Sequence, residues 1–391
     1  MADIPNNAMP GHSIRSYDYN LPDETIAKYP LKNRRDSKLL VYKNSRVKNS
    51  RFSDLIEHLP ERSLLVFNNT KVIPARLYFK RNTGARIELL LIRKVDGGEN
   101  QWKCMVGNKA KFKEEEELQN MSEPSLRAHW VNRSENIIAF SSSGSVYDAL
   151  MRVGEMPLPP YLNRNAEPDD KIRYQTIFAE NEGAVAAPTA SLHFDENLIA
   201  EMDSKDINIT NCTLHVGLGT FAPVKEDDVN KHVMHSEYWQ VSRNFIEDVF
   251  NDSYKIVPVG TTSMRVVESI CIAAHNLIRG DKDPFHIKQG EGYNLDYSAK
   301  PLHELRDVLM HYMDENQLQE ISGTTSLFIT PGFKIKLTHA LITNFHQPKS
   351  TLLLLVATLL GNDWLGVYEY ALKNSYRFLS YGDSSILYRR K

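Results

Sequence analysis

Residues 256–277 read IVPVGTTSMRVVESICIAAHNL and indicate the fold of the larger part of this chain. The first four residues form an apolar run of strand length, and residues 263–277 carry apolar side chains at helical spacing. A strand candidate at 207–216, and a strand at 337–344 followed by a helix at 349–360, continue the alternation. Strands that alternate with helices predict a layered α/β domain whose strands are at least partly parallel.

Between residues 74 and 155 the pattern changes to short, closely spaced strands without a long helix. The strand candidates are residues 75–81, 86–93, 101–106, 126–131 and 136–140. This spacing is typical of a small β-barrel or sandwich. We therefore predict an α/β main domain over residues 1–73 and 156–391, with a small β-barrel domain inserted at 74–155. Residues 280–322 are polar, hold one helix candidate at 302–313, and are predicted to form a surface insertion.

Composition places the 391-residue chain among ordinary globular proteins, with 41% hydrophobic and 25% charged residues. The longest apolar run, residues 352–360, is too short to span a bilayer, and residues 1–20 show no apolar signal-peptide core. We therefore expect a cytoplasmic protein with no membrane association. Cys104, Cys212 and Cys271 lie far apart without a CxxC pair, so neither a disulfide framework nor a zinc site is expected.

The charge is unevenly distributed along the chain. Residues 1–113 contain 22 Lys and Arg against 11 Asp and Glu, whereas residues 114–391 contain 25 against 38. A basic N-terminal third is a plausible footprint for a polyanion. A lysine-rich solvated surface explains the same numbers equally well.

Four segments rich in Gly, Thr, Ser and His are candidates for chemistry: residues 186–194, 214–221, 259–265 and 343–351. In open α/β sheets, ligands bind beyond the carboxyl ends of the strands, where loops lead into helices. Glycine allows backbone N–H groups to approach a ligand, and a helix N-terminus suits a carboxylate, a phosphate or a ribose hydroxyl. Dinucleotide-binding, P-loop, zinc-protease and serine-hydrolase motifs are absent from the sequence. Any one such junction is more often simply a capped turn, so the residues alone do not name a reaction.

The ordered set of segments is more specific than any single one. It resembles the S-adenosylmethionine:tRNA ribosyltransferase-isomerase family of the queuosine pathway, over about residues 14–388. The matching segments are RRDSKLLV (34–41), FNNTKVIPARL (67–77), GEMPLPPY (154–161), AAPTASLHF (186–194), LHVGLGTF (214–221), HSE (235–237), VGTTSMR (259–265), TNFHQPKST (343–351) and YRFLSYGD (376–383).

The resemblance implies an α/β fold with an inserted β-barrel, and it implies a reaction. The ribosyl part of S-adenosylmethionine moves onto 7-aminomethyl-7-deazaguanine at the tRNA wobble position. The product is epoxyqueuosine in tRNA, and adenine and methionine are released. S-adenosylmethionine is then a consumed co-substrate, and no metal or redox cofactor is expected. The expected partners are this tRNA and S-adenosylmethionine, and the expected state is a monomer.

On this resemblance we assign roles to individual residues as hypotheses. His215 and His346 are candidates for catalytic base and acid, and Asp383 for orienting one of them or receiving the amine proton. Arg265 is predicted to bind the methionine carboxylate. The remaining predicted substrate-binding residues are Thr189, His193, Gly217, Gly219, Thr220, Gly260, Thr261, Lys349 and Ser350. The predicted RNA-binding residues are Arg34, Arg35, Lys71 and Arg76.

Three positions depart from what we expect for the family. Asn69 stands where Asp is usual, Ser191 where Gly is usual, and Asp195 where Thr is usual. Asn retains hydrogen bonding but cannot carry a proton as Asp can. Two alternatives therefore stay open: a diverged paralogue of the same fold that acts on another nucleoside, and a non-catalytic RNA-binding relative.

Overall fold

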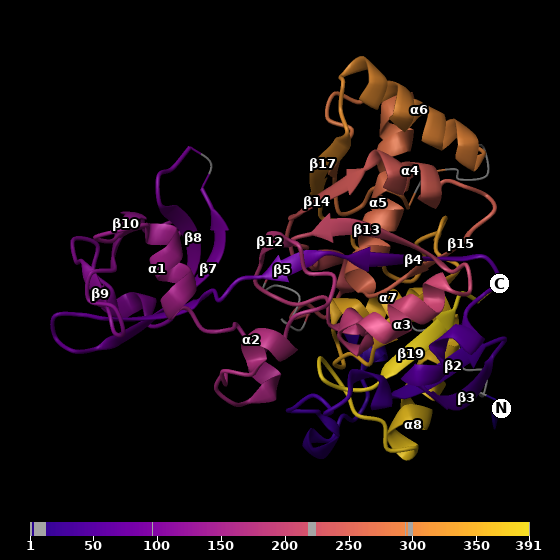
Figure 1. Ribbon diagram of the computed structural model, residues 1–391, viewed down its shortest axis with the longest axis horizontal. Helices are drawn as coiled ribbons and strands as arrows, with labels where there is room; N and C mark the ends of the chain where they lie inside the picture. The colour runs from indigo at the N-terminus through magenta and orange to yellow at the C-terminus, as the bar shows by residue number, and fades with distance from the viewer. Residues whose placement is uncertain are drawn as a thin grey trace.

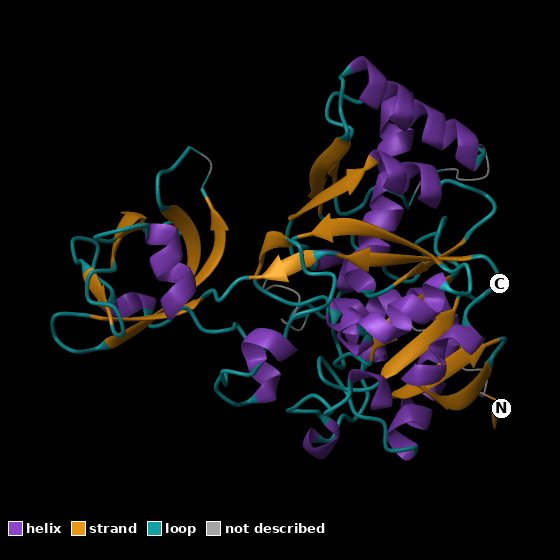
Figure 2. Ribbon diagram, viewed as in Figure 1, coloured by secondary structure: helices purple, strands orange, loops and turns teal. Residues whose placement is uncertain are grey.

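The computed structural model describes residues 2–3, 13–95, 97–217, 224–293, 295 and 300–390. It consists of a layered α/β main body and a smaller closed β-barrel that stands beside it (Figures 1 and 2). The predicted fold class, an α/β domain with a small inserted barrel, is confirmed.

Two sheets form the main body in the described part of the chain. The strands of the first, in spatial order, are β15 (Lys255–Pro258), β4 (Ser63–Asn68), β13 (Asn208–Leu214), β14 (Glu237–Ser242), β17 (Glu320–Thr325) and β16 (His286–Ile287). The strands of the second are β1 (Ala2–Asp3), β3 (Arg46–Arg51), β2 (Lys38–Lys43), β19 (Ser384–Tyr388) and β18 (Ala340–Asn344). Parallel bridges between Val259 and Ile342 and between Ile256 and Thr338 join the sheets at β15 and β18.

Strand β4 lies at the centre of the main body, and all six of its residues are buried. It pairs in parallel with both β13 and β15. Leu64 and Val66 pack in the same core as α5 (Thr261–Ile278), while Leu65 and Phe67 pack in the core that includes α3 (Glu196–Asp203). A parallel strand covered on both faces is expected to be apolar throughout, which explains the sequence SLLVFN.

The region predicted as a surface insertion contributes to the main body. Strand β17 pairs with β14 along its whole length, from Glu237–Thr325 to Ser242–Glu320. Helix α6 (Leu302–Glu315) packs on α5 and on α4 (Arg243–Val249), and Leu309 is completely buried in that contact layer. The region therefore completes an edge of the sheet and its helical layer.

The barrel comprises six strands among the described residues, closed in the order β10-β11-β8-β7-β6-β9. Their bounds are β6 (Arg76–Lys80), β7 (Arg86–Lys94), β8 (Gln101–Val106), β9 (Leu118–Asn120), β10 (Arg127–Asn132) and β11 (Ile137–Ser141). Each of the five strand candidates corresponds to one of them, and β9 was not predicted. Apolar side chains such as Leu89 and Phe112 fill the barrel, and α1 (Val146–Val153) packs against it. Strands β5 (Thr70–Val72) and β12 (Asn181–Ala184) pair where the chain passes between barrel and main body (Figure 1).

Residues 351–373 form α7 (Thr351–Leu360), a 3₁₀ turn, and α8 (Trp364–Lys373). By length and composition this stretch is apolar enough to cross a membrane. However, 67% of its most apolar part is buried inside the protein, as in the core helix of a globular domain.

The packing of α6 predicts that the 280–322 region contributes to the stability of the main body. Leu309→Ala leaves a cavity between α6 and α5 and should lower the free energy of unfolding by about 2–5 kcal/mol. Urea denaturation measures this change. His303→Ala, at an exposed position of the same helix, is the control and should change stability by less than about 0.5 kcal/mol. An equally small effect of Leu309→Ala would show that the helix is dispensable.

Candidate active site

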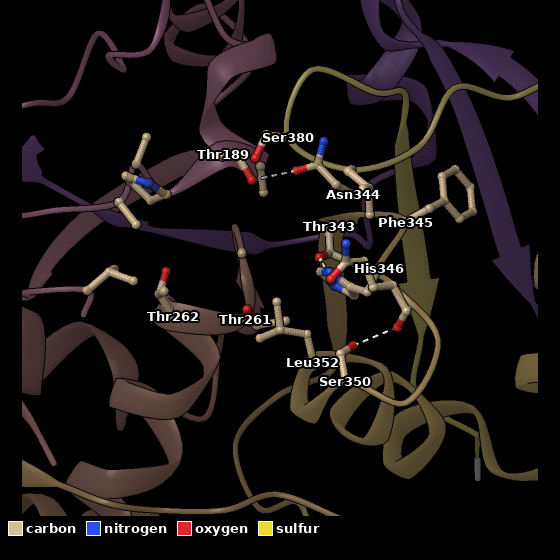
Figure 3. A pocket seen from close by; sticks show the side chains of 18 of the residues that line it. Thr189, Thr261, Thr262, Thr343, Asn344, Phe345, His346, Ser350, Leu352 and Ser380 are labelled. Carbon is tan, nitrogen blue, oxygen red and sulfur yellow. Dashed lines mark hydrogen bonds between the residues drawn. The ribbon is translucent and has the colours of Figure 1, made fainter. Parts of the chain in front are cut away.

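A cavity that opens to solvent, with about 670 Å³ of empty space including its mouth, lies where the predicted junctions meet (Figure 3). Residues 186–190, Val216, residues 260–262 and residues 343–347 all line it. Because β13, β15 and β18 run in the same direction, their carboxyl ends reach the same edge of the main body. All four segments singled out in the sequence therefore contribute to one cavity.

The N-terminus of α5 forms one wall of this cavity. Gly260 adopts a φ of 94°, a conformation that favours glycine, and donates its N–H to the Ile342 carbonyl at 2.8 Å. Gly260 offers no side chain to cap the helix, so the first N–H groups of α5 remain available beside the cavity. The hydroxyl of Thr262, also in this wall, is buried and has no hydrogen-bond partner among the described residues. This wall suits a carboxylate or another anionic group.

His346 is the histidine that lines the cavity. Its Nε2 lies 3.0 Å from Oγ1 of Thr343, and burial lowers its pKa to about 3. Its backbone is held by the hydroxyls of Tyr19 and Tyr368. The described cavity lining contains no Asp, Glu, Lys or Arg. A neutral imidazole in such surroundings can accept a proton from a bound molecule.

A chain of hydrogen bonds supports the opposite wall. The hydroxyl of Thr189 donates to Oδ1 of Asn344 at 3.2 Å, as Figure 3 shows. Asn344 Nδ2 in turn lies 3.2 Å from His193 Nε2, and His193 Nδ1 lies 2.9 Å from Oγ of Ser37. Burial, followed by the positive charge of Arg377, lowers the pKa of His193 to about 3, so this histidine is neutral. His193 therefore acts on the cavity through Asn344, a residue that the sequence analysis did not single out.

Arg265 lies beside the cavity in a smaller adjoining pocket that shares Thr261 and Thr262 with it. Its guanidinium pairs with the buried carboxylate of Glu237 and donates to the carbonyls of Thr325 and Leu327. These contacts favour a positioning role for Arg265 over the direct carboxylate contact predicted from the sequence.

The carboxylate of Glu237 ties Arg265 to the 214–217 loop. It also accepts hydrogen bonds from the Gly217 N–H at 2.9 Å and from His235 Nε2 at 3.0 Å. The pKa of Glu237 falls to about 2, because these partners, with Arg265 foremost, outweigh the effect of burial. Gly217 is thus linked to α5 through the buried Glu237–Arg265 ion pair.

Two of the predicted catalytic residues do not line the cavity. His215 faces Thr70, with Nδ1 and Oγ1 2.9 Å apart, and stacks on Tyr238. Asp383 accepts the backbone N–H groups of Lys38 and Arg377 and pairs with the Arg377 side chain at 3.2 Å. Asp383 therefore fixes the 377–383 turn, from which Ser380 reaches the cavity (Figure 3).

Among the other predicted site residues, some line the cavity and others form contacts elsewhere. Ser350 caps α7 and lines the cavity, whereas Lys349 pairs with Asp18 at 2.7 Å. Gly219 and Thr220 lie outside the described residues. Of the predicted RNA-binding residues, Arg34 donates to backbone carbonyls, and the pairs Arg35–Glu201, Lys71–Glu182 and Arg76–Glu88 are ion pairs.

None of the three departures from the expected family pattern is among the described residues that line the cavity. Asn69 accepts a hydrogen bond from Thr213 at 2.7 Å and donates to Glu180 at 3.1 Å. Asp195 caps α3 through the Leu198 N–H at 2.8 Å, a role that Thr also fills well. Ser191 is buried and is not among the residues with positive φ, so its backbone does not require glycine.

A known protein family matches nearly the whole chain. The family described as queuosine biosynthesis protein matches residues 14–387. This chain belongs to that family. Among its relatives is the S-adenosylmethionine:tRNA ribosyltransferase-isomerase of Staphylococcus haemolyticus (strain JCSC1435), 36% identical over 390 residues, covering 96% of this chain and 99% of that protein. The protein of the same name from Staphylococcus aureus (strain Newman) is 37% identical over 385 residues, with 96% and 99% covered.

A solved structure also resembles this member of the queuosine biosynthesis protein family. It is the S-adenosylmethionine tRNA ribosyltransferase of Thermotoga maritima, which is 30% identical. The match covers 95% of this chain and 99% of that one, with a TM-score of 0.47.

The Glu237–Arg265 pair predicts a specific pH dependence of stability. The pKa of Glu237 is depressed in the folded state, so the carboxylate stabilises the fold above its usual value of 4.5, and this contribution is lost as the pH falls towards 2. Glu237→Gln should lower the free energy of unfolding at pH 7 by about 3 kcal/mol. Chemical denaturation of both proteins should show this difference shrinking between pH 5 and pH 2. A difference independent of pH would contradict the assignment.

Proposed function

We propose that this chain is an S-adenosylmethionine:tRNA ribosyltransferase-isomerase. It transfers and isomerises the ribosyl moiety of S-adenosylmethionine onto 7-aminomethyl-7-deazaguanine at the tRNA wobble position, and adenine and methionine are released. Membership of the queuosine biosynthesis protein family and the names of the relatives support this assignment. The observation that carries it is the cavity in which a neutral histidine faces an uncapped helix N-terminus.

The chemistry requires a base next to the sulfonium. The positive sulfur acidifies the hydrogens on C5′, and a neutral imidazole accepts one of them at pH 7. We assign this role to His346, because it is the imidazole in the described cavity lining. Thr343 holds the ring through Nε2.

The walls of the cavity match the other parts of the co-substrate. The methionine carboxylate is placed at the N-terminus of α5, where the Gly260–Thr261 turn and the unpartnered Thr262 hydroxyl offer hydrogen bonds. Thr189 and Asn344 on the opposite wall offer a hydroxyl and an amide to the adenine or ribose. Apolar residues such as Val216, Phe345 and Leu352 line the same space and help to exclude water during ring opening.

We also propose how this enzyme uses its co-substrate, which cofactors it needs, and in which state it acts. S-adenosylmethionine is consumed as a co-substrate, and the reaction needs no metal or redox cofactor. The second substrate is tRNA that carries the deazaguanine base, and the protein acts as a cytoplasmic monomer.

His346→Gln tests the assignment of the base. Glutamine retains hydrogen bonding but cannot take up a proton, so adenine release should fall by roughly a hundredfold or more. The assay follows adenine by chromatography after S-adenosylmethionine is mixed with tRNA bearing the deazaguanine base. Binding of S-adenosylmethionine, measured by calorimetry, should change much less.

The control is His311→Gln on α6, an exposed histidine that pairs with Glu315 and should keep wild-type activity. Near-normal adenine release by the His346 variant would remove it as the base. If the wild-type protein binds S-adenosylmethionine and releases no adenine with this tRNA, the paralogue alternative is correct. Salt-dependent tRNA binding without S-adenosylmethionine binding would instead identify an RNA-binding relative.

A further inference from the structure

A second pocket, with about 310 Å³ of empty space, lies beside the candidate active site. Three arginines from segments far apart in the sequence line it: Arg34, Arg173 and Arg377. Arg173 ends the short helix α2 (Asp170–Arg173), and Arg377 belongs to the turn fixed by Asp383. The mechanism described above uses none of these three side chains.

The positive charge of this arginine pocket is only partly neutralised. Arg34 donates to the carbonyls of Leu192, Ile172 and Gln175, and Arg173 donates to the Leu31 carbonyl. These backbone carbonyls accept hydrogen bonds from the guanidinium groups but carry no negative charge. The positive charge of Arg34 and Arg173 therefore remains. Within the described part of the chain, Arg377 is the one of the three with a carboxylate in direct contact, that of Asp383 at 3.2 Å.

The electrostatic surroundings of the pocket confirm that like charges are close together. Burial and the neighbouring charge of Arg173 lower the pKa of Arg34, and the more weakly acting Glu196 and Asp195 do not reverse this. His193 in the same pocket is neutral and adds no charge. The pocket is therefore a partly buried cationic site, and a doubly hydrogen-bonding anion such as phosphate fits the arginine fork.

The arginine pocket and the active-site cavity adjoin each other. Ser380 lines both spaces. His193, in the arginine pocket, accepts a hydrogen bond from Asn344, in the cavity wall. In a nucleotide, one sugar separates the base from its phosphates. The wobble nucleotide must bring its aminomethyl group to the co-substrate in the cavity, so a phosphate next to that nucleotide is within reach of the arginine pocket.

We propose that the arginine pocket binds a phosphodiester of the RNA strand next to the wobble nucleotide. This inference rests on the proposed function, in that it takes RNA as the substrate. A phosphodiester is favoured over the methionine carboxylate because the carboxylate already has a site at the N-terminus of α5. In addition, exposed Lys32 and Lys171 lie next to pocket-lining segments and extend the basic surface outward.

The test is a coupling measurement between Arg173 and single phosphates of the RNA. Arg173 is chosen because Arg34 holds three carbonyls and its loss would disturb the structure. In the full-length protein, Arg173→Gln should weaken binding of the tRNA about tenfold, since hydrogen bonds to charged groups are of that strength. The slope of log affinity against log salt should decrease by about 0.7–0.9 for the lost phosphate contact.

A matched pair of modified RNAs shows which phosphate contacts Arg173. Anticodon stem-loops that carry one uncharged methylphosphonate, on the 5′ or the 3′ side of the wobble nucleotide, should each be compared with the unmodified RNA. One of the two should bind the wild-type protein about tenfold more weakly, and that loss should disappear in Arg173→Gln. Arg173→Lys keeps the charge but loses the fork, so it should bind more weakly than wild type while retaining the salt slope.

Arg306→Gln on α6, remote from both pockets, is the control and should bind RNA like the wild type. Equal methylphosphonate losses in wild type and Arg173→Gln at both positions would overturn the proposal. A loss of S-adenosylmethionine affinity with unchanged RNA binding would overturn it in favour of the carboxylate. These are binding measurements, so their outcome does not depend on adenine release. The adenine-release assay tests the proposed reaction separately.

Discussion

The direction of a few parallel strands is the constraint on which this structure depends. Strand β4 pairs in parallel with β13 and β15, and parallel bridges connect β15 to β18. Their carboxyl ends therefore lie at one edge, and the loops that follow them must share the space beyond it. Gly260, with its positive φ, lets β15 turn directly into α5 at this edge and leaves the helix N-terminus facing the cavity.

Buried polar contacts then fix the side chains around this space. Glu237 and Arg265 hold the 214–217 loop against α5, and the Asn344–His193–Ser37 chain holds the opposite wall. Most of these groups are buried, so breaking any of these hydrogen bonds would leave a buried polar group unsatisfied and lower stability. The hydrogen bonds therefore restrict each wall to one arrangement. A cavity with walls fixed in this way, with a neutral histidine and no charged side chain in its described lining, is suited to a reaction that must exclude water.

The sequence predicted the architecture because the signals for it are local. Strand and helix periods, turn residues and the Gly-Thr-Thr junction are read within a few residues, and all four predicted junctions meet at the cavity. Side-chain direction and long-range partners are not local. Val216 lines the cavity while the preceding His215 faces Thr70, since successive side chains of an extended chain point to opposite sides. The pairing of Arg265 with Glu237 spans 28 residues and required the three-dimensional structure.

The most direct test of this account is a crystal structure of the protein with S-adenosylmethionine bound. The account predicts that the methionine carboxylate contacts the backbone N–H groups at the start of α5. It also predicts that C5′ lies within reach of the His346 imidazole, and that the adenosine contacts Thr189 or Asn344. Density for the nucleoside outside this cavity, for example beside His215 and Tyr238, would contradict it.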